Sequence, residues 1–117
     1  MTIKNNGGTI RDVNVLSLEE KQRAKDFLQR SVYCWCKNKP DEEFAVRTLV
    51  GAENADWRGT PLQPLYDKHR KTSATEDDAY AKAAKDAGWL LKRVIKDDKR
   101  KFNLIQNRVN HYIWLRE

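Results

Sequence analysis

The chain has 117 residues, with 23 Lys and Arg against 17 Asp and Glu and a formal net charge of +6. This length fits one domain and excludes a large multidomain enzyme. The sequence contains no apolar run of about 18 residues, which a membrane span requires, and its first residues lack the apolar core of a signal peptide. We therefore expect a protein of the cytoplasm, or of the host-cell cytoplasm if it is viral.

The positive charge is concentrated near the C-terminus. Residues 88–117 hold eight basic and three acidic side chains, whereas residues 1–87 hold 15 basic and 14 acidic ones. A basic end on a nearly neutral body is typical of proteins that bind nucleic acid. A lysine-rich surface that is merely solvated would give the same count, so charge alone does not decide between the two.

The first third of the chain predicts a mobile arm followed by one long helix. Residues 1–16 show no sustained hydrophobic period, and we expect an arm with a short extended piece at 13–15. Ser17 and Glu20 form a capping-box pair, and apolar residues then recur every three or four positions. This pattern predicts a helix that starts at Ser17 and ends near Lys37.

The middle of the chain predicts shorter helices. Residues 40–51 begin with a proline and three acidic residues, which favours a helix, although the alternation that starts at Phe44 also suits a short strand. We prefer the helix. Thr60 followed by Pro61 predicts the start of another helix, which ends before a polar break at 71–75.

The last third predicts two helical segments and a hairpin. Thr75 precedes three carboxylates, which are stabilised at the positive end of a helix dipole. Gly88 interrupts the apolar face, so we expect it to separate two helices, the second ending near Asp98. Apolar and polar residues then alternate between Lys101 and Leu115, which predicts a two-stranded hairpin.

The spacing around Gly88 resembles that of a helix-turn-helix. Ala84, Gly88 and Val94 are the small residue, the turn residue and the inward-facing branched residue that such a motif needs. A basic hairpin follows, so the layout of residues 60–116 is similar to that of winged helix-turn-helix DNA-binding domains, including the small C-terminal domains of phage replication primases and helicases. The resemblance implies an α+β, mainly helical fold. Residues 17–117 would then be a single winged-helix-like domain with an additional N-terminal helix and a C-terminal β-hairpin.

The resemblance also implies where DNA would be bound. The segment from Gly88 to Asp98 would be the recognition helix, and the hairpin would be the wing. Seven residues are the expected nucleic-acid contacts, the first three to bases or phosphates and the others to phosphates: Lys92, Arg93, Lys96, Lys99, Arg100, Lys101 and Arg108. We therefore expect a non-catalytic protein that binds duplex DNA, a microbial or phage regulator or accessory factor, with no cofactor and no metal.

Two other functions remain open. A protein-interaction module, or a small inhibitor of a nucleic-acid enzyme, could use the aromatic residues Trp57, Trp89, Tyr112 and Trp114 as its anchor. A small nuclease could use His69 and His111, although nothing in their spacing predicts that they meet. Cys34 and Cys36 point to different sides of a helix, so we expect small core residues rather than a metal site.

Overall fold

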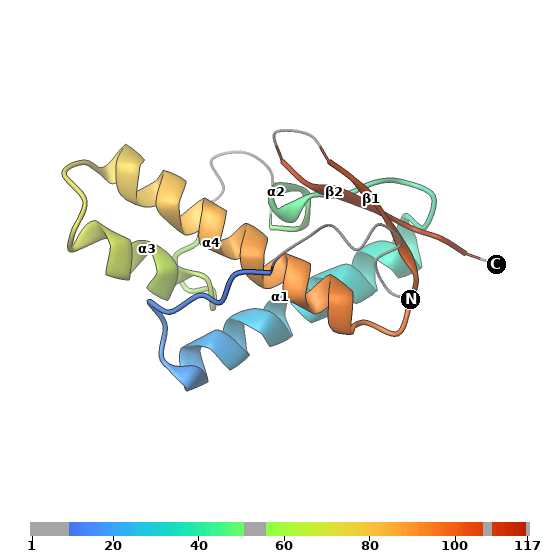
Figure 1. Cartoon of the computed structure of the whole chain (residues 1–117), viewed down its shortest axis with the longest axis horizontal. Helices are drawn as coiled ribbons and strands as arrows, with labels where there is room; N and C mark the ends of the chain where they lie inside the picture. The colour runs from blue at the N-terminus through green and yellow to red at the C-terminus, as the bar shows by residue number, and fades with distance from the viewer. Residues whose placement is uncertain (1–9, 51–55, 107–108, 117) are drawn as a thin grey trace.

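The computed structural model describes residues 10–50, 56–106 and 109–116. These residues form α1 (Leu18–Asn38), α2 (Val46–Leu49), α3 (Gln63–Arg70), α4 (Glu76–Asp97), β1 (Phe102–Ile105) and β2 (His111–Trp114). The two long helices, α1 and α4, cross each other, with α3 beside the first half of α4 and the hairpin beside its second half (Figure 1). The expected α+β, mainly helical fold class is confirmed. No helix within these three described ranges has the length and apolar character needed to cross a membrane.

Helix α1 begins where the sequence predicts. The Ser17 hydroxyl accepts a hydrogen bond from the Glu20 backbone amide at 3.1 Å, and the Glu20 carboxylate accepts one from the Ser17 amide at 2.9 Å. This reciprocal pairing satisfies two backbone donors at the start of the helix. One face of α1 is buried along its whole length, through Ala24, Leu28, Val32 and Cys36.

Helix α4 runs without a break from Glu76 to Asp97, so the prediction that Gly88 separates two helices is wrong. The expected cap is present, because the Thr75 hydroxyl accepts a hydrogen bond from the Asp78 amide at 3.1 Å. A glycine inside a helix costs only about 1 kcal/mol relative to alanine. The fully buried residues on either side of it, such as Ala87 and Leu91, gain more than this by packing, and the helix therefore continues.

The segment 40–51 combines the two structures that its sequence left open. Phe44 forms an isolated antiparallel bridge with Tyr112, with backbone N···O distances of 2.8 Å in both directions. The helix that follows is only α2, four residues long. The preferred prediction of a helix over most of this segment is thus wrong for its first half, because pairing with β2 holds the backbone at Phe44 extended.

The next helix begins later than expected. The Thr60 hydroxyl accepts a hydrogen bond from the Leu62 amide at 3.2 Å, and the helix α3 itself starts at Gln63. The polar break that ends α3 is confirmed as a turn. Leu62, the N-cap residue of α3, and Leu65, within the helix, are fully buried.

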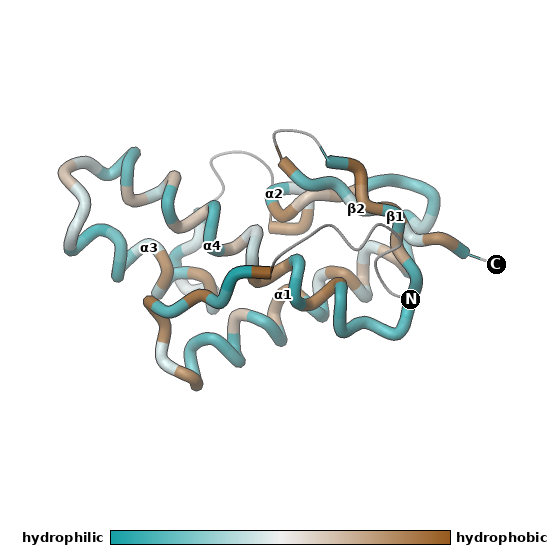
Figure 2. Tube along the Cα trace, viewed as in Figure 1, coloured by the Kyte–Doolittle hydropathy of each residue, from teal (hydrophilic) through white to brown (hydrophobic). Residues whose placement is uncertain are grey.

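The hairpin closes the core at the C-terminal end. Phe102 pairs with Trp114 and Leu104 pairs with Tyr112, which places Phe102, Leu104 and Tyr112 on the buried face. Phe44 joins them, with ring-centroid distances of 6.0 Å to Phe102 and 5.9 Å to Tyr112. Apolar residues recur along α4 and alternate with polar ones along the hairpin (Figure 2). The turn residues 107–108 lie outside the described part of the chain.

The expected mobile arm is, in its described part, attached to the core. Val13 is 3% exposed and Leu16 is 7% exposed, and both belong to the main apolar cluster. Residues 13–15 do not belong to a strand. Residues 1–9 lie outside the described residues. The arm therefore places residues 10–16 against α4, where they contribute to the candidate site (Figure 1).

Candidate nucleic-acid interface

Five residues of α4 form a basic stripe with one aromatic ring at its centre. Each of them lies three or four positions along the helix from another member of the set, and we call them the α4 stripe: Lys85, Trp89, Lys92, Arg93 and Lys96. At 100° per residue they fall within about 100° of the helix circumference. At 1.5 Å per residue they extend over about 17 Å. The α4 stripe thus places four cationic groups along one side of a rigid element.

Two cationic side chains, one from the stripe and one from the N-terminal arm, lie near the ring of Trp89. The Lys92 ammonium lies 5.4 Å from the ring centroid, and the Arg11 guanidinium from the N-terminal arm lies 5.7 Å from it. Both distances allow an attraction between the positive charge and the electron-rich ring face. Arg11 therefore joins a stripe from which it is about 80 positions distant in sequence, because residues 10–16 pack against α4.

Lys92 is in a different environment from the one expected. It is only 4% exposed, so it does not share a solvated face with Arg93 and Lys96, which are both exposed. Its aliphatic stem is buried and its ammonium is near Trp89, an arrangement typical of long cationic side chains.

The guanidinium of Arg100 makes contacts within the protein itself. It lies against both oxygens of the Asp98 carboxylate, at 3.0 and 2.9 Å, and its guanidinium lies 5.1 Å from the Tyr33 ring centroid. Asp98 is 5% exposed and also accepts a hydrogen bond at 2.7 Å from Gln29. Because Arg100 neutralises this buried carboxylate, its role is to fasten the end of α4 to α1 and to the hairpin.

The other expected contact residues are divided between α4 and the base of the hairpin. Arg93, Lys96, Lys99 and Lys101 are exposed, and Arg108 lies outside the described residues. Within the described ranges neither Arg93 nor Lys99 forms a salt bridge, although the hydrogen bond from Lys21 and, to a smaller extent, the charge of Arg93 lower the pKa of the Asp12 carboxyl. Lys99 and Lys101 precede β1, and they are therefore at the base of the hairpin rather than at its tip.

Sequence reasoning did not include Lys85, Trp89 and Arg11 among the expected nucleic-acid contacts, and Trp89 entered it only as a possible anchor for a protein partner. The spacing of Lys85 and Trp89 from Lys92 and Lys96 indicates one face of a continuous helix. The expected helix break at Gly88 hid this relation, because it separated Lys85 from the others. Arg11 had no signal of its own, because only tertiary packing brings it to Trp89.

The remaining aromatic and thiol candidates are mostly part of the core. Trp57 is 5% exposed and Tyr112 is 1% exposed. Cys36 is buried, and burial raises the pKa of its thiol to about 11, whereas Cys34 is exposed, so the expectation of a core position is wrong for Cys34. No group of His, Cys, Asp and Glu residues suitable for a metal ion occurs in the described part of the chain.

The two histidines are not brought together. His69 lies in the last turn of α3, 2.6 Å from the Asp86 carboxylate on α4, whereas His111 begins β2 and contacts the Val109 carbonyl oxygen at 3.0 Å. Helix α3 and the hairpin lie beside opposite halves of α4 (Figure 1). The residue pair that a nuclease would need is thus not assembled.

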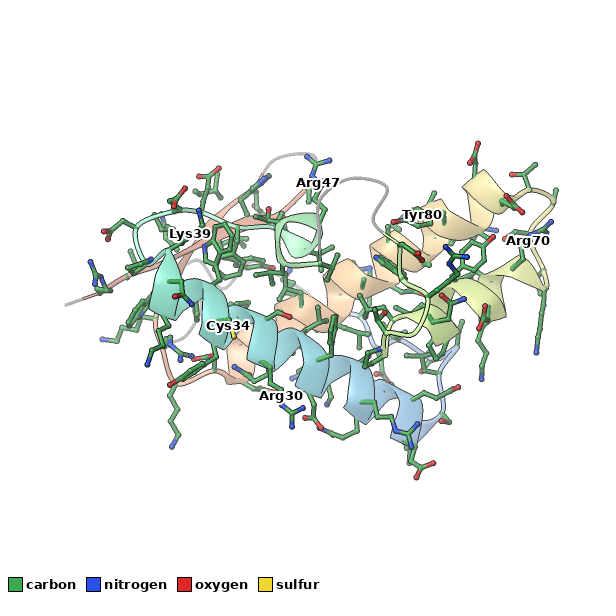
Figure 3. All side chains as sticks on the ribbon, turned by 180° about the vertical axis from the view of Figure 1, so that it is seen from behind. Arg30, Cys34, Lys39, Arg47, Arg70 and Tyr80 are labelled. Atoms are coloured by element: carbon green, nitrogen blue, oxygen red, sulfur yellow. The ribbon has the colours of Figure 1, made fainter. Side chains whose placement is uncertain are left out.

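A second row of cations lies on α1. Arg23, Arg30 and Lys37 are seven residues apart, exposed, and without salt bridges among the described residues. Figure 3 shows Arg30 projecting from α1 away from the body of the protein. The row provides three exposed cations whose removal can be compared with the removal of three cations from the α4 stripe.

Comparison of the chain with protein-family models, with curated proteins and with solved structures finds no match.

Proposed function

We propose that this protein binds duplex DNA without catalysing a reaction on it, and that the α4 stripe is its main contact surface. The observation that carries the proposal is the stripe itself, a row of four cations along α4, with Lys92 and Arg11 against the ring of Trp89. Lysine and arginine side chains in such a row neutralise successive phosphates and release the counterions bound to them. This role agrees with a microbial or phage regulator or accessory factor, which meets DNA in the cytoplasm of the cell or of the infected host.

The mode of binding differs from that of a helix-turn-helix. Since α4 is continuous through Gly88, there is no recognition helix that starts at this residue. The side of α4, rather than its N-terminal end, faces the DNA. We therefore expect phosphate contacts to dominate and sequence preference to be modest, because phosphate contacts carry no sequence information.

The winged-helix resemblance now depends on the hairpin. A long helix is followed by β1 and β2, and Phe44 forms a single isolated bridge with β2. In the proposed complex the base of the hairpin, with Lys99 and Lys101, adds phosphate contacts next to the end of the α4 stripe. Arg100 is not included, because its guanidinium is held by Asp98.

Salt titrations with a matched control test the proposal. One variant replaces Lys85, Arg93 and Lys96 by Gln, and the control replaces Arg23, Arg30 and Lys37 by Gln, which removes the same charge from α1. Binding to a labelled duplex of random sequence is followed by fluorescence anisotropy over a series of sodium chloride concentrations. If all three stripe cations touch phosphates, the plot of log affinity against log salt flattens by about 2.7 units in the first variant. The α1 variant should keep the slope of the parent protein.

Three results would contradict the proposal. Equal flattening in both variants would mean that only the total charge matters. An unchanged slope in the stripe variant would remove α4 from the contact surface. Absence of salt-dependent binding by the parent protein would reject DNA binding and favour a protein-interaction module.

A further inference from the structure

A groove with a volume of about 320 Å³ lies between α1 and α2, and we call it the α1 groove. Apolar side chains form most of its described lining: Phe27, Cys34, Trp35 and Leu49. Figure 3 shows Cys34 and Arg30 on the same side of α1. Ligand-binding clefts have volumes of about 300–1,000 Å³, so the α1 groove suits a side chain of a partner better than a large ligand.

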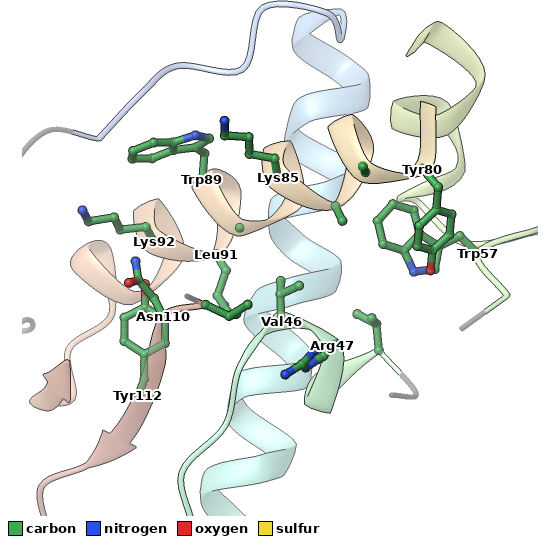
Figure 4. A pocket seen from close by; sticks show the side chains of 15 residues that line it. Val46, Arg47, Trp57, Tyr80, Lys85, Trp89, Leu91, Lys92, Asn110 and Tyr112 are labelled. Atoms are coloured by element: carbon green, nitrogen blue, oxygen red, sulfur yellow. The ribbon is translucent and has the colours of Figure 1, made fainter. Parts of the chain in front are cut away.

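Helix α2 separates the α1 groove from a larger groove on its α4 side. Figure 4 shows the larger groove, with Val46 of α2 on one side and Lys85 and Trp89 of α4 on the other. Thr48 and Leu49 of α2 belong instead to the α1 groove. The α4 stripe thus borders the larger groove, and the α1 groove is separate from the surface proposed for DNA.

The α1 groove presents apolar surface to solvent. Phe27, Trp35 and Leu49 pack against the core but remain partly exposed. Two polar groups of the lining are hydrogen-bonded within the protein, because the Ser31 hydroxyl donates to the Phe27 carbonyl oxygen and the Trp35 indole N–H donates to the Glu42 carbonyl oxygen, both at 2.9 Å. An apolar side chain that covers this surface removes it from water, which is favourable.

A row of cations runs along α1 beside the groove. Residues 23–37 hold four basic side chains and one acidic side chain. We call Arg23, Arg30 and Lys37 the α1 row, and their spacing of seven places them within about 40° of the helix circumference and over about 21 Å of its length. All three are exposed, and none forms a salt bridge within the described ranges.

The α1 row and the α1 groove share an edge. Phe27 is four residues after Arg23, and Cys34 is four residues after Arg30, so each pair lies on one face of the helix. Arg30 also lines the groove itself. Asp26 lies about 60° from Arg23 on the side away from Phe27, and its carboxylate accepts a hydrogen bond from another side chain of α1. The edge of the groove is therefore positively charged.

We propose that the α1 groove docks an acidic segment of a partner protein. An apolar side chain of the partner would enter between Phe27 and Leu49, and carboxylates on either side of it would lie along the α1 row. Such an arrangement makes the two surfaces complementary in charge. Duplex DNA is also negatively charged, but it has no apolar side chain for the groove, so a peptide accounts for both features. The proposal stands without the proposed function.

The probe for the test is a ten-residue peptide with the sequence EDEELFEDEE, labelled with fluorescein at its N-terminus. Its binding is measured by fluorescence anisotropy in 0.1 M sodium chloride. The α1 variant, in which Gln replaces the three cations of the α1 row, should bind about tenfold more weakly, as the loss of three surface charge pairs predicts. The stripe variant removes the same charge from α4 and is the matched control. It should bind the peptide as the parent protein does, because salt screens charges separated by more than about 10 Å.

A second pair of variants tests the groove. Ser31→Leu places a side chain in the groove and should weaken binding about tenfold or more, because the apolar side chain of the peptide is no longer buried. Gln22→Leu is the control, since it adds the same leucine to α1 at an exposed position outside the described lining. This variant should keep the affinity of the parent protein, and circular dichroism shows whether both variants fold.

The exposed thiol of Cys34 provides a test that does not depend on a substitution. Alkylation of Cys34 with N-ethylmaleimide in the folded protein fills the groove, and it should weaken peptide binding as Ser31→Leu does. This measurement keeps the proposal testable if Ser31→Leu does not fold. Saturating peptide should also slow the alkylation of Cys34, which mass spectrometry follows.

Two analogues of the peptide test the ligand class. One replaces its leucine and phenylalanine by alanine, and the other replaces its acidic residues by glutamine and asparagine. Each should bind about tenfold more weakly or worse, because one loses the buried apolar side chains and the other loses the charge pairs.

The proposal is overturned if the parent protein does not bind the acidic peptide, if the α1 and stripe variants lose equal affinity, or if the protein with a filled groove binds as the parent does. Analogues that bind as tightly as the acidic peptide would reject the ligand class. An α1 variant that loses affinity for duplex DNA but not for the peptide would assign the α1 row to a DNA surface. The peptide assays contain no DNA, so the two proposals fail separately.

Discussion

Replacement of Gly88 by alanine should stabilise the protein. Gly88 lies inside α4, its φ angle is not in the left-handed region, and an added Cβ atom would meet nothing within 4 Å. The methyl group therefore costs no steric strain, while alanine removes the entropic penalty of glycine in a helix interior, which is about 0.5–1 kcal/mol. For a chain of 117 residues the unfolding entropy is about 0.25 kcal/mol per kelvin, so Tm should rise by about 2–4 °C.

Gly59 provides the control for this prediction. Its φ angle is +78°, and an added Cβ atom there would also meet nothing within 4 Å. Gly59→Ala therefore isolates the cost of forcing a left-handed backbone on an L-residue, about 1–2 kcal/mol, and Tm should fall by several degrees. Thermal unfolding followed by circular dichroism measures both variants. If Gly88→Ala lowers Tm as Gly59→Ala does, Gly88 lies in a turn and the continuous α4 described above is incorrect.

Three further predictions concern the core and its attachments. Arg100→Ala should lower the free energy of unfolding by about 3–5 kcal/mol in urea denaturation, since it leaves the Asp98 carboxylate buried without its cation; a loss below 1 kcal/mol would show that Arg100 does not fasten α4. In the native protein at pH 8 a disulfide reagent should modify the exposed Cys34 rapidly and spare Cys36, because burial raises the pKa of the Cys36 thiol to about 11. Both thiols should react after denaturation, and rapid reaction of both in the native protein would contradict the buried position of Cys36. Phe44→Ala should cost about 3–5 kcal/mol, because the ring is fully buried, and a much smaller loss of stability would place Phe44 outside the core.

The sequence determined the elements that depend on local interactions. The capping box at Ser17 and Glu20 joins groups three residues apart, so the start of α1 could be read directly. The same is true of Thr75 at the start of α4. The alternation along 101–115 determined the hairpin, because successive side chains of a strand point to opposite faces.

Where the local preferences for helix and for other structures are weak, tertiary packing determined which structure forms. The small penalty of Gly88 was visible in the sequence, but the burial of Ala87 and Leu91 that exceeds it was not. At Phe44 the choice between helix and strand followed from pairing with Tyr112, which is 68 positions away in the chain. Differences of about 1 kcal/mol between local structures are easily reversed by such contacts.

Only the tertiary structure decided which charges belong to the candidate site. Sequence analysis could count the C-terminal cations, but it expected both Arg93 and Arg100 to contact nucleic acid. Their difference follows from Asp98, which is buried and held by Gln29 across 69 positions of sequence, and which in turn engages Arg100. The contact of Arg11 with Trp89 has the same origin. The charge of a side chain is a local property, whereas its burial and its partner are set by segments that meet only in the folded chain.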